Sequence, residues 1–348
     1  MESKENGNGV CDSVDENGVD VPLRSISNGA TDDETSSSVH HVSGEMSELI
    51  FLGSGSSTGV PSPICLMQPT QPPCFVCHSA MEGPPALNRN YRCNPSLLIN
   101  YLHEDGSRRY IQIDAGKNFK EQVLRWYIAY KVPRLDALIL THEHADAILG
   151  LDDIRGVQAY SSHNNIEPMP IFLTQRTMES IHQKFPYLVR RPLKEGEEVR
   201  RVAQLDWRVI EASFSKFEAA GLDIMPLPVM HGEDYISLGF LFGRKSLVVY
   251  ISDVSRIPPS TEQEIFSAGA IEILVLDCLY KKGPHNTHFC WDESLKAVKR
   301  LRPKRAFFVG MTHEFYHERE NAELADWSKR EGIEVQLAHD GLRIPVEI

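Results

Sequence analysis

Apolar residues recur along the chain in short continuous runs bounded by Gly, Pro, Asn or Asp, a pattern typical of buried β-strands. Between these runs, apolar residues return every three or four positions, as in amphipathic helices. The predicted strands cover 49–55, 96–102, 110–114, 137–140, 170–174, 205–210, 222–230, 237–242, 247–252, 271–276, 305–309 and 335–338. The predicted helices cover 118–130, 148–155, 175–185, 292–301 and 323–330. This order predicts an α/β fold of two mixed sheets with helices on their outer faces.

The first 47 residues lack this pattern and are rich in Asn, Gly, Ser, Asp and Glu. Such a segment buries too little apolar surface to offset the entropy of ordering it. We therefore predict a disordered acidic tail over 1–47 and one folded domain over 48–348. The run 35–38 carries hydroxyls open to phosphorylation, so a regulatory tail stays an alternative to a passive one. A product that starts at Met46 is predicted to fold and to keep its activity.

Composition narrows the class of protein. Hydrophobic residues make up 41% of the 348, enough for a sizeable core. Of the net charge of −12, the first 47 residues carry −8, so no strongly basic groove for nucleic acid is expected in the domain. No apolar run approaches the roughly 20 residues that span a bilayer, and the N-terminus lacks the pattern of a secretory or organellar signal. We expect a small-molecule substrate, no membrane partner, and a cytoplasmic or nuclear location in which seven cysteines stay reduced.

The chemistry begins after the predicted strand 137–140, in the segment ALILTHEHAD. His142, His144 and Asp146 follow the strand two residues apart. In a loop that leaves a strand end, this spacing can turn several side chains toward one point, and imidazole and carboxylate are ligands of zinc and similar ions. The alternative is a polar turn with scattered histidines.

Other predicted strands also end in residues that can bind a metal. His231, Asp253 and His313 each follow an apolar run. A single strand-end histidine is a weak signal, but the repeated pattern indicates a metal site assembled from several strands. Asp114 also ends a strand, where it can either orient a ligand histidine or cap the helix that follows.

The long loop over 61–95 is rich in Pro and Cys. Cys74 and Cys77 have the C-x-x-C spacing of a zinc half-site, with Cys65 and Cys93 on either side. A structural metal and a set of reduced, packed thiols are both open interpretations. The glycine-rich turn over 53–59 is interpreted as a tight turn beside a site, because the prolines after it argue against a nucleotide-binding helix.

The order and types of these residues resemble those of the metallo-β-lactamase superfamily of hydrolases, from about residue 48 onward. The resemblance implies a four-layer αββα sandwich with metal ions at one edge of the paired sheets. It also implies a role for each strand-end residue: His142, His144 and His231 hold a first ion, Asp146 and His313 hold a second, Asp253 bridges both, and Asp114 orients a ligand histidine. The family motif continues with a histidine where this chain has Ala147. The loss of that nitrogen favours a harder ion such as manganese, or a single-ion enzyme.

Further segments resemble the branch of cyclic-nucleotide and phosphonate-pathway phosphodiesterases: FLGSGSSTGVP, the cysteine-rich loop, THEHADAILGLDDIR, LDC, HNTH and MTHEF. In that branch, a cysteine cluster and a C-terminal histidine bind a structural zinc. Cys74 and Cys77 match two of its cysteines directly. A third family cysteine corresponds to Pro72, so Cys65 is expected to replace it, and His317 is expected as the fourth ligand.

The resemblance implies an enzyme, and the first hypothesis is a phosphodiesterase that cleaves a small or cyclic phosphodiester through metal-activated hydroxide. One or two ions of zinc or manganese are expected at the active site. His288 is the expected proton donor to the leaving group, with His285 as its rival, while Asp146 or Asp253 accepts the water proton. A transfer-RNA 3′-processing endonuclease and a non-catalytic metal-binding protein on the same fold stay alternatives. A monomer and a homodimer are both open.

Overall fold

The computed structural model describes residues 46–159, 166–189 and 203–348. The predicted tail lies outside the described residues except for its last two, and so does the serine-rich run 35–38. The tail, its boundary and the product starting at Met46 therefore stay predictions. Two seven-stranded sheets organise the described residues.

The first sheet has the strand order β14-β1-β2-β3-β4-β5-β6. Its strands are β1 (Ser47–Gly53), β2 (Ser96–Leu102), β3 (Arg108–Ile113), β4 (Ala137–Ile139), β5 (Met169–Thr174), β6 (Leu205–Ile210) and β14 (Arg343–Val346). Pairing is antiparallel from β14 to β3 and parallel from β3 to β6. The carboxyl ends of β3 and β4 therefore meet at one edge.

The second sheet has the order β13-β12-β11-β10-β9-β8-β7. Its strands are β7 (Phe217–Ala219), β8 (Leu222–Met230), β9 (Ile236–Phe242), β10 (Leu247–Ile251), β11 (Ile271–Asp277), β12 (Arg305–Val309) and β13 (Glu334–Leu337). Pairing is antiparallel from β7 to β10 and parallel from β10 to β13. Since two antiparallel steps separate β8 from β10, the strands β8, β10, β11 and β12 all run in one direction.

The helical elements are α1 (Pro63–Met67), α2 (Phe75–Ser79), η1 (Pro85–Leu87), α3 (Phe119–Gln122), η2 (Val123–Tyr127), α4 (Ile128–Tyr130), α5 (Ala145–Ile148), η3 (Leu151–Val157), α6 (Gln175–Lys184), α7 (Pro259–Ala268), α8 (Trp291–Leu301) and α9 (His317–Glu331). The helix predicted over 118–130 is confirmed as the continuous run α3-η2-α4. The helix predicted over 148–155 is instead two short pieces, α5 and η3. Between them lies Gly150, where a β-carbon would overlap the side chain of Phe119 and the Gly116 carbonyl.

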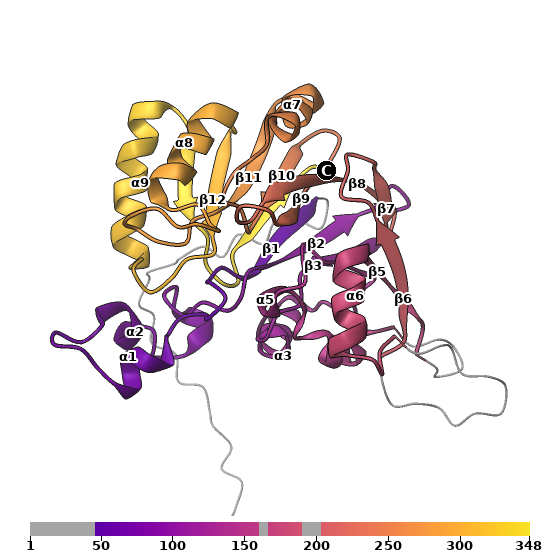
Figure 1. The fold of residues 1–348 in the computed structure, drawn as a ribbon, viewed down its shortest axis with the longest axis horizontal. Helices are drawn as coiled ribbons and strands as arrows, with labels where there is room; N and C mark the ends of the chain where they lie inside the picture. Colours follow the sequence, from indigo (N-terminus) through magenta and orange to yellow (C-terminus); the bar gives the residue numbers. More distant parts are fainter. Residues whose placement is uncertain (1–45, 160–165, 190–202) are drawn as a thin grey trace, which may run out of the picture. The chain divides into compact units, whose positions relative to one another are not determined.

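Helices cover the outer faces of the two sheets, which gives four layers (Figure 1). Three large apolar clusters lie between these layers. One lies between the sheets and joins residues such as Phe51 of β1 to Phe240 of β9 and Phe307 of β12. A second packs the helices α3 to α6 on the outer face of the first sheet, and a third packs α7, α8 and α9 on the second. The αββα sandwich expected from the sequence is thereby confirmed.

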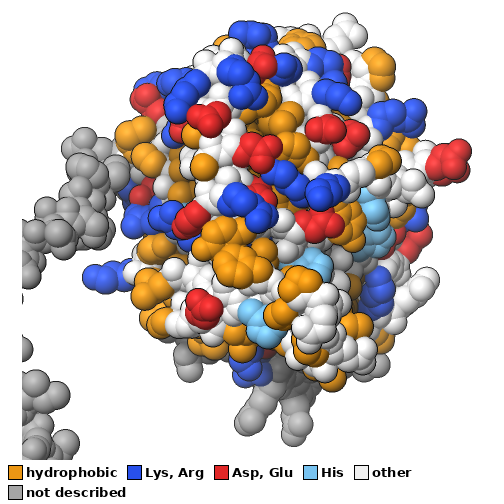
Figure 2. All heavy atoms as spheres, turned by 90° about the vertical axis from the view of Figure 1, so that its left-hand side faces the viewer, with side chains coloured by type: hydrophobic (Ala, Val, Ile, Leu, Met, Phe, Trp, Pro, Cys, Tyr) orange, Lys and Arg blue, Asp and Glu red, His pale blue; other side chains and the backbone are white. Residues whose placement is uncertain are grey.

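Charge is distributed without a single dominant sign on the face that carries α9. Figure 2 shows basic and acidic side chains interspersed there, with apolar side chains between them. The described part of the chain contains no helix that is both long and apolar enough to cross a membrane.

Candidate functional site

The predicted histidines converge where strands of both sheets end. His142 and His144 follow β4 of the first sheet, and His231 follows β8 of the second. The three rings have pairwise centroid distances of 4.5, 5.2 and 5.1 Å. One nitrogen from each ring lies within 4.8 Å of the others. The fold therefore brings two histidines that follow a strand of the first sheet together with a third, up to 89 positions away in the sequence, that follows a strand of the second.

A relay of hydrogen bonds fixes the ring of His142. The carboxylate of Asp114 accepts bonds from the backbone N–H and the hydroxyl of Thr141, both at 2.8 Å. Because that hydroxyl donates to Asp114, it accepts from His142 Nδ1–H, at 2.8 Å. His142 Nε2 then carries a lone pair, and this buried atom has no hydrogen-bond partner within the described residues. Burial lowers the pKa of His142 to about 3, so the ring is neutral and able to bind a metal.

Asp114 therefore orients a histidine, which is the first of its two predicted roles. Its φ of 62° lies in the left-handed region, an uncommon conformation for a residue other than glycine. Gly116, two residues later, packs so closely that a β-carbon there would overlap the carbonyl of Asp146. The turn after β3 therefore packs directly against the loop after β4.

His231 is oriented by a different contact. Its Nδ1 lies 2.7 Å from the backbone carbonyl of Thr287, which can only accept, so Nδ1 carries the proton. The lone pair of Nε2 points into the site, 3.3 Å from His144 Nδ1. These donors fit a divalent ion: His142 Nε2, His144 Nδ1 and His231 Nε2 would hold it.

Two aspartates border the three histidines. Asp253 follows β10, accepts a hydrogen bond of 2.6 Å from Ser252 Oγ, and lies with His231 and His288 in a second converging set. Burial opposes ionisation of Asp253, but the neighbouring histidines lower its pKa to about 2. Burial and the charge of Asp253 raise the pKa of Asp146 to about 6. Asp146 is buried next to the site, but it belongs to neither converging set of described residues.

His288 forms a dyad with Asp277. Its Nδ1 lies 2.7 Å from Asp277 Oδ2 at the end of β11, which leaves Nε2 to face the site. Burial alone would lower the pKa of His288, but the charge of Asp277 and this hydrogen bond raise it to about 9. Space for the carboxylate depends on Gly310, because a β-carbon there would lie 2.6 Å from Asp277 Oδ1. His285, the predicted rival, is exposed, and its ring centroid is 5.5 Å from that of His288.

The prediction for His313 requires a correction. Its Nδ1 lies 3.1, 3.4 and 3.3 Å from the sulfur atoms of Cys65, Cys74 and Cys77, and the four ligand atoms converge within 4.8 Å. His313 therefore belongs to the cysteine cluster and not to the second active-site ion. The fully buried Arg92 supports this placement, because it donates hydrogen bonds to the carbonyls of Thr312 and Phe315 on either side.

The prediction for His317 is corrected with it. His317 is the first residue of α9, its Nε2 lies 2.9 Å from the side-chain amide of Asn321, and it is not part of the converging set of the three cysteines. Burial lowers its pKa to about 3. The cysteine cluster fits a metal, since burial and the neighbouring thiols raise the pKa of Cys77 to about 12 and a cation would compensate three thiolates.

Several residues that shape the site were not assigned from the sequence. Thr141 and the Thr287 carbonyl orient ligands, and Asp277 supports His288. Asp277 ends an apolar strand, which is the same signal that identified Asp253. The two threonines carry no comparable signal, because neither is a metal ligand.

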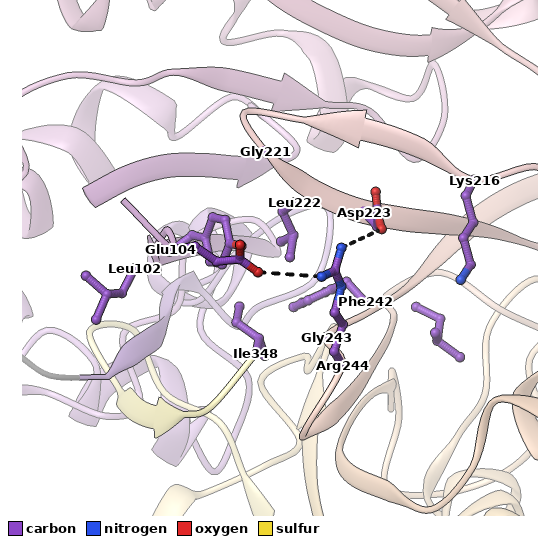
Figure 3. Close-up of a pocket in the computed structure, with 12 residues that line it drawn as sticks. Leu102, Glu104, Lys216, Gly221, Leu222, Asp223, Phe242, Gly243, Arg244 and Ile348 are labelled. Carbon is purple, nitrogen blue, oxygen red and sulfur yellow. Dashed lines mark hydrogen bonds and ion pairs between the residues drawn. The ribbon is translucent and has the colours of Figure 1, made fainter. Parts of the chain in front are cut away.

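A separate pocket of about 170 Å³ lies where β8 begins (Figure 3). The strand is 9 residues long, so this pocket is roughly 30 Å from His231 at the other end. Figure 3 shows Arg244 between Glu104 and Asp223, with ion pairs of 3.6 and 3.3 Å. Because Arg244 is paired with these two carboxylates, this pocket offers no unpaired cation at Arg244 for a phosphate. We therefore take the histidine cluster as the candidate functional site.

Comparison with known proteins agrees with this fold and site. Residues 109–311 match the model of the β-lactamase superfamily domain, which is more than half of the chain. The chain belongs to this superfamily.

A solved structure of a diphosphatase from the PhnP family is 30% identical, with a TM-score of 0.67, covering 87% of this chain and 98% of that one. The expected branch is thereby confirmed. Zinc-bound PqqB from Methylobacterium extorquens is 17% identical, with a TM-score of 0.61 over 86% of this chain and 100% of that one, and shares the fold. An octanoyltransferase of Porphyromonas gingivalis is 26% identical over 298 residues, or 85% of this chain. The match spans 52% of that relative, so the chain covers about half its length.

Proposed function

We propose that this protein is a metal-dependent phosphodiesterase that cleaves a P–O bond of a small or cyclic phosphodiester. The observation that carries the proposal is the buried Nε2 of His142, which has no hydrogen-bond partner among the residues that the structure describes and converges with a nitrogen each of His144 and His231. A lone pair held this way is costly to bury without a cation. The relative at 30% identity is named a diphosphatase, and breaking a diphosphate also cleaves a P–O bond.

The residues around the histidines supply the remaining chemistry. A divalent ion bound there would lower the pKa of a coordinated water and polarise a phosphoryl oxygen. Asp253 or Asp146 would accept the proton of the attacking water. His288, held by Asp277 through Nδ1, would present a proton on Nε2 to the departing oxygen. A leaving alkoxide needs this proton, because it is a far stronger base than the histidine.

We further propose a single ion at the histidines, held with the help of Asp253. The family's additional histidine is replaced by Ala147, which lies in the apolar cluster under the helices. His313, the other nitrogen expected at a second ion, lies with the cysteines. Asp146 and Asp253 alone are a poor ligand set for a second zinc. Experiment must decide whether the single ion at the histidines is zinc or manganese.

Two alternatives are less well supported. A transfer-RNA endonuclease needs a basic surface for the phosphate backbone, whereas the net charge of this chain is −12, which disfavours such a surface. A non-catalytic binding protein would not need the His288–Asp277 dyad next to the ligands.

The test is hydrolysis by full-length protein loaded separately with zinc and manganese. The panel is bis(p-nitrophenyl) phosphate, a cyclic nucleotide, a dinucleoside diphosphate, a precursor transfer RNA and an acyl thioester. We expect turnover of one or more of the small phosphate esters, and its loss in His142→Ala. Turnover of the RNA or the thioester alone, or no turnover by protein shown to contain metal, would contradict the proposal.

A further inference from the structure

The three histidines are not held in the same way. Hydrogen bonds to Thr141 and Thr287 fix the rings of His142 and His231. His144 is exposed, and within the described residues its ring has no hydrogen-bond partner other than His231. A ligand histidine normally uses its second nitrogen to fix its orientation. Something else must therefore restrain this ring.

That restraint is the ring of Tyr235. The two rings stack, with centroids 5.2 Å apart and an interplanar angle of 15°. Stacking of this kind stabilises a ring pair beyond the effect of the area it buries. It limits rotation of the imidazole, which a solvent-exposed side chain would otherwise retain.

Tyr235 is itself held by two charged residues. Its hydroxyl donates a hydrogen bond of 2.5 Å to Glu143 Oε2, and Arg176 Nε donates one of 2.9 Å to Glu143 Oε1. The guanidinium carbon of Arg176 lies 4.2 Å from the centroid of the tyrosine ring. Lys184, also on α6, donates to the backbone carbonyl of Glu143 at 2.9 Å. The ring of Tyr235 is thus held at its hydroxyl by Glu143 and on one face by the guanidinium of Arg176.

This cluster joins the two sheets at the site. Glu143 and His144 follow β4 of the first sheet, whereas Tyr235 lies in the turn between β8 and β9 of the second. That turn is closed by a bond of 2.8 Å from the N–H of His231 to the carbonyl of Tyr235. Moving Tyr235 would therefore shift a ligand histidine on each side.

We propose that Tyr235 is a positioning residue for the metal centre, holding His144 in its ligand orientation by stacking, with Glu143 and Arg176 holding Tyr235. This inference rests on the metal site of the proposed function, but not on its substrate. It also gives a role to Glu143, the one residue of THEHAD between the ligand histidines that no ligand pattern explains.

The experiment measures zinc affinity of the histidine site by competition with a chelating dye, in protein whose cysteine cluster is already filled. His142→Ala defines the signal of the other site. Tyr235→Leu is expected to weaken zinc binding by about 10- to 100-fold, the usual range for loss of a residue that orients a ligand. Tyr235→Phe keeps the stack and should stay within about threefold of wild type.

Tyr187→Leu is the matched control. Tyr187 is also partly exposed and donates a hydrogen bond of 2.9 Å to a carboxylate, that of Asp152, but it touches no ligand. It should bind zinc as the wild type does. Cobalt(II) absorption supplies a second readout, since the histidine-site spectrum should change in Tyr235→Leu and stay constant in Tyr235→Phe.

Arg176→Ala keeps the proposal testable if Tyr235→Leu does not fold, because 60% of the Arg176 side chain is exposed. A smaller loss of zinc affinity is expected there. Unchanged affinity in folded Tyr235→Leu would overturn the proposal, as would an equal loss in Tyr235→Phe. If the wild type binds zinc tightly but cleaves no phosphodiester, the proposed phosphodiesterase function is wrong. The role of Tyr235 is still tested by the zinc affinities of the variants.

Discussion

The histidine cluster and the cysteine cluster each gather ligand atoms within 4.8 Å, but they draw them from different kinds of structure. The histidines follow strands whose side chains form two large apolar cores, and neighbouring groups pre-orient them. The cysteines lie on or beside α1 and α2, helices of 5 residues each in a long loop. The apolar cluster beside them is small and centres on Val60, Val76 and Ala80.

The difference indicates what each ion does. Where an apolar core already fixes the ligands, metal binding adds little to the free energy of folding, and the ion can act in catalysis. Where the core is small, the free energy of metal binding becomes folding free energy. We therefore interpret the cysteine cluster as the element that anchors the loop 61–95 to the segment around His313, far along the chain.

The largest expected effect is on stability and comes from the cysteine cluster. Cys74→Ser or His313→Ala should remove one zinc per chain and lower the free energy of unfolding by on the order of 5 kcal/mol, less than the binding energy of zinc-finger peptides because the sandwich persists. Metal analysis, thermal unfolding and limited proteolysis within the loop measure this. The control is Cys93→Ser, a buried cysteine outside the cluster. Full zinc content in His313→Ala would contradict the assignment.

The reverse pattern is expected for His142→Ala. It should lose the other zinc and more than about 100-fold in phosphodiester hydrolysis, since loss of an orienting partner alone costs 10- to 100-fold. Its unfolding midpoint should change far less than that of His313→Ala. Equal destabilisation by the two variants would remove the distinction between the sites.

The sequence predicts the parts of the two sites that depend on local patterns, and it fails where a site depends on contacts between residues far apart in the chain. Apolar runs that end in His or Asp are local, so His142, His144, His231 and Asp253 could be assigned without a structure. The choice between His313 and His317 depends on contact with a loop 236 or more residues away, which no local pattern encodes. Tyr235 and Thr141 were missed because they orient ligands without binding metal.

The same reasoning applies to the fold. Most strands of both sheets followed from the apolar runs, but the short edge strand β7 did not. The helix α7 was not predicted either, because only Thr261 and Ile265 of its ten residues are buried. The helix α9 begins at His317, not at 323, because its first two turns are mostly charged and lack an apolar stripe. Strand β14, which pairs with β1, follows the turn at which the predicted strands ended.

Substitution of His288 tests whether hydrolysis takes place at the histidine cluster. His288→Ala should slow hydrolysis of an alkyl phosphodiester by about 10²–10⁴-fold, the usual contribution of a general acid. The loss should be much smaller for a p-nitrophenyl ester, whose leaving group departs without a proton. Asp277→Asn should follow the same order with smaller losses. Equal losses for both esters, measured as kcat, would argue against proton donation.

The response of zinc affinity to pH should also separate the clusters. Without metal, burial and the neighbouring thiols raise the pKa of Cys77 to about 12, so zinc binding at neutral pH displaces the proton of this thiol. Affinity there should therefore rise steeply with pH. His142, with a pKa of about 3, is already neutral at that pH, so this ligand releases no proton when the histidine site binds zinc, and the affinity there should depend less on pH than at the thiols. Competition titrations at several pH values, using Cys74→Ser and His142→Ala to isolate each site, measure the two slopes.

The smallest expected effect concerns the relay behind His142. Thr141→Val removes the hydroxyl that links Asp114 to the ring, at nearly constant volume. We expect about a 10-fold loss of zinc affinity at the histidine site and none at the cysteine cluster. Thr312→Val, next to His313, is the matched control and should leave the histidine site unchanged. Equal affinity in Thr141→Val and wild type would show that the relay does not orient the ligand.

The most direct measurement of the two-site account is anomalous diffraction at the zinc edge from crystals of the zinc-loaded protein. The account predicts two peaks per chain. One lies among His142, His144 and His231, and the other lies among Cys65, Cys74, Cys77 and His313. A third peak beside Asp146, or His313 bound to the ion at the histidines, would contradict it.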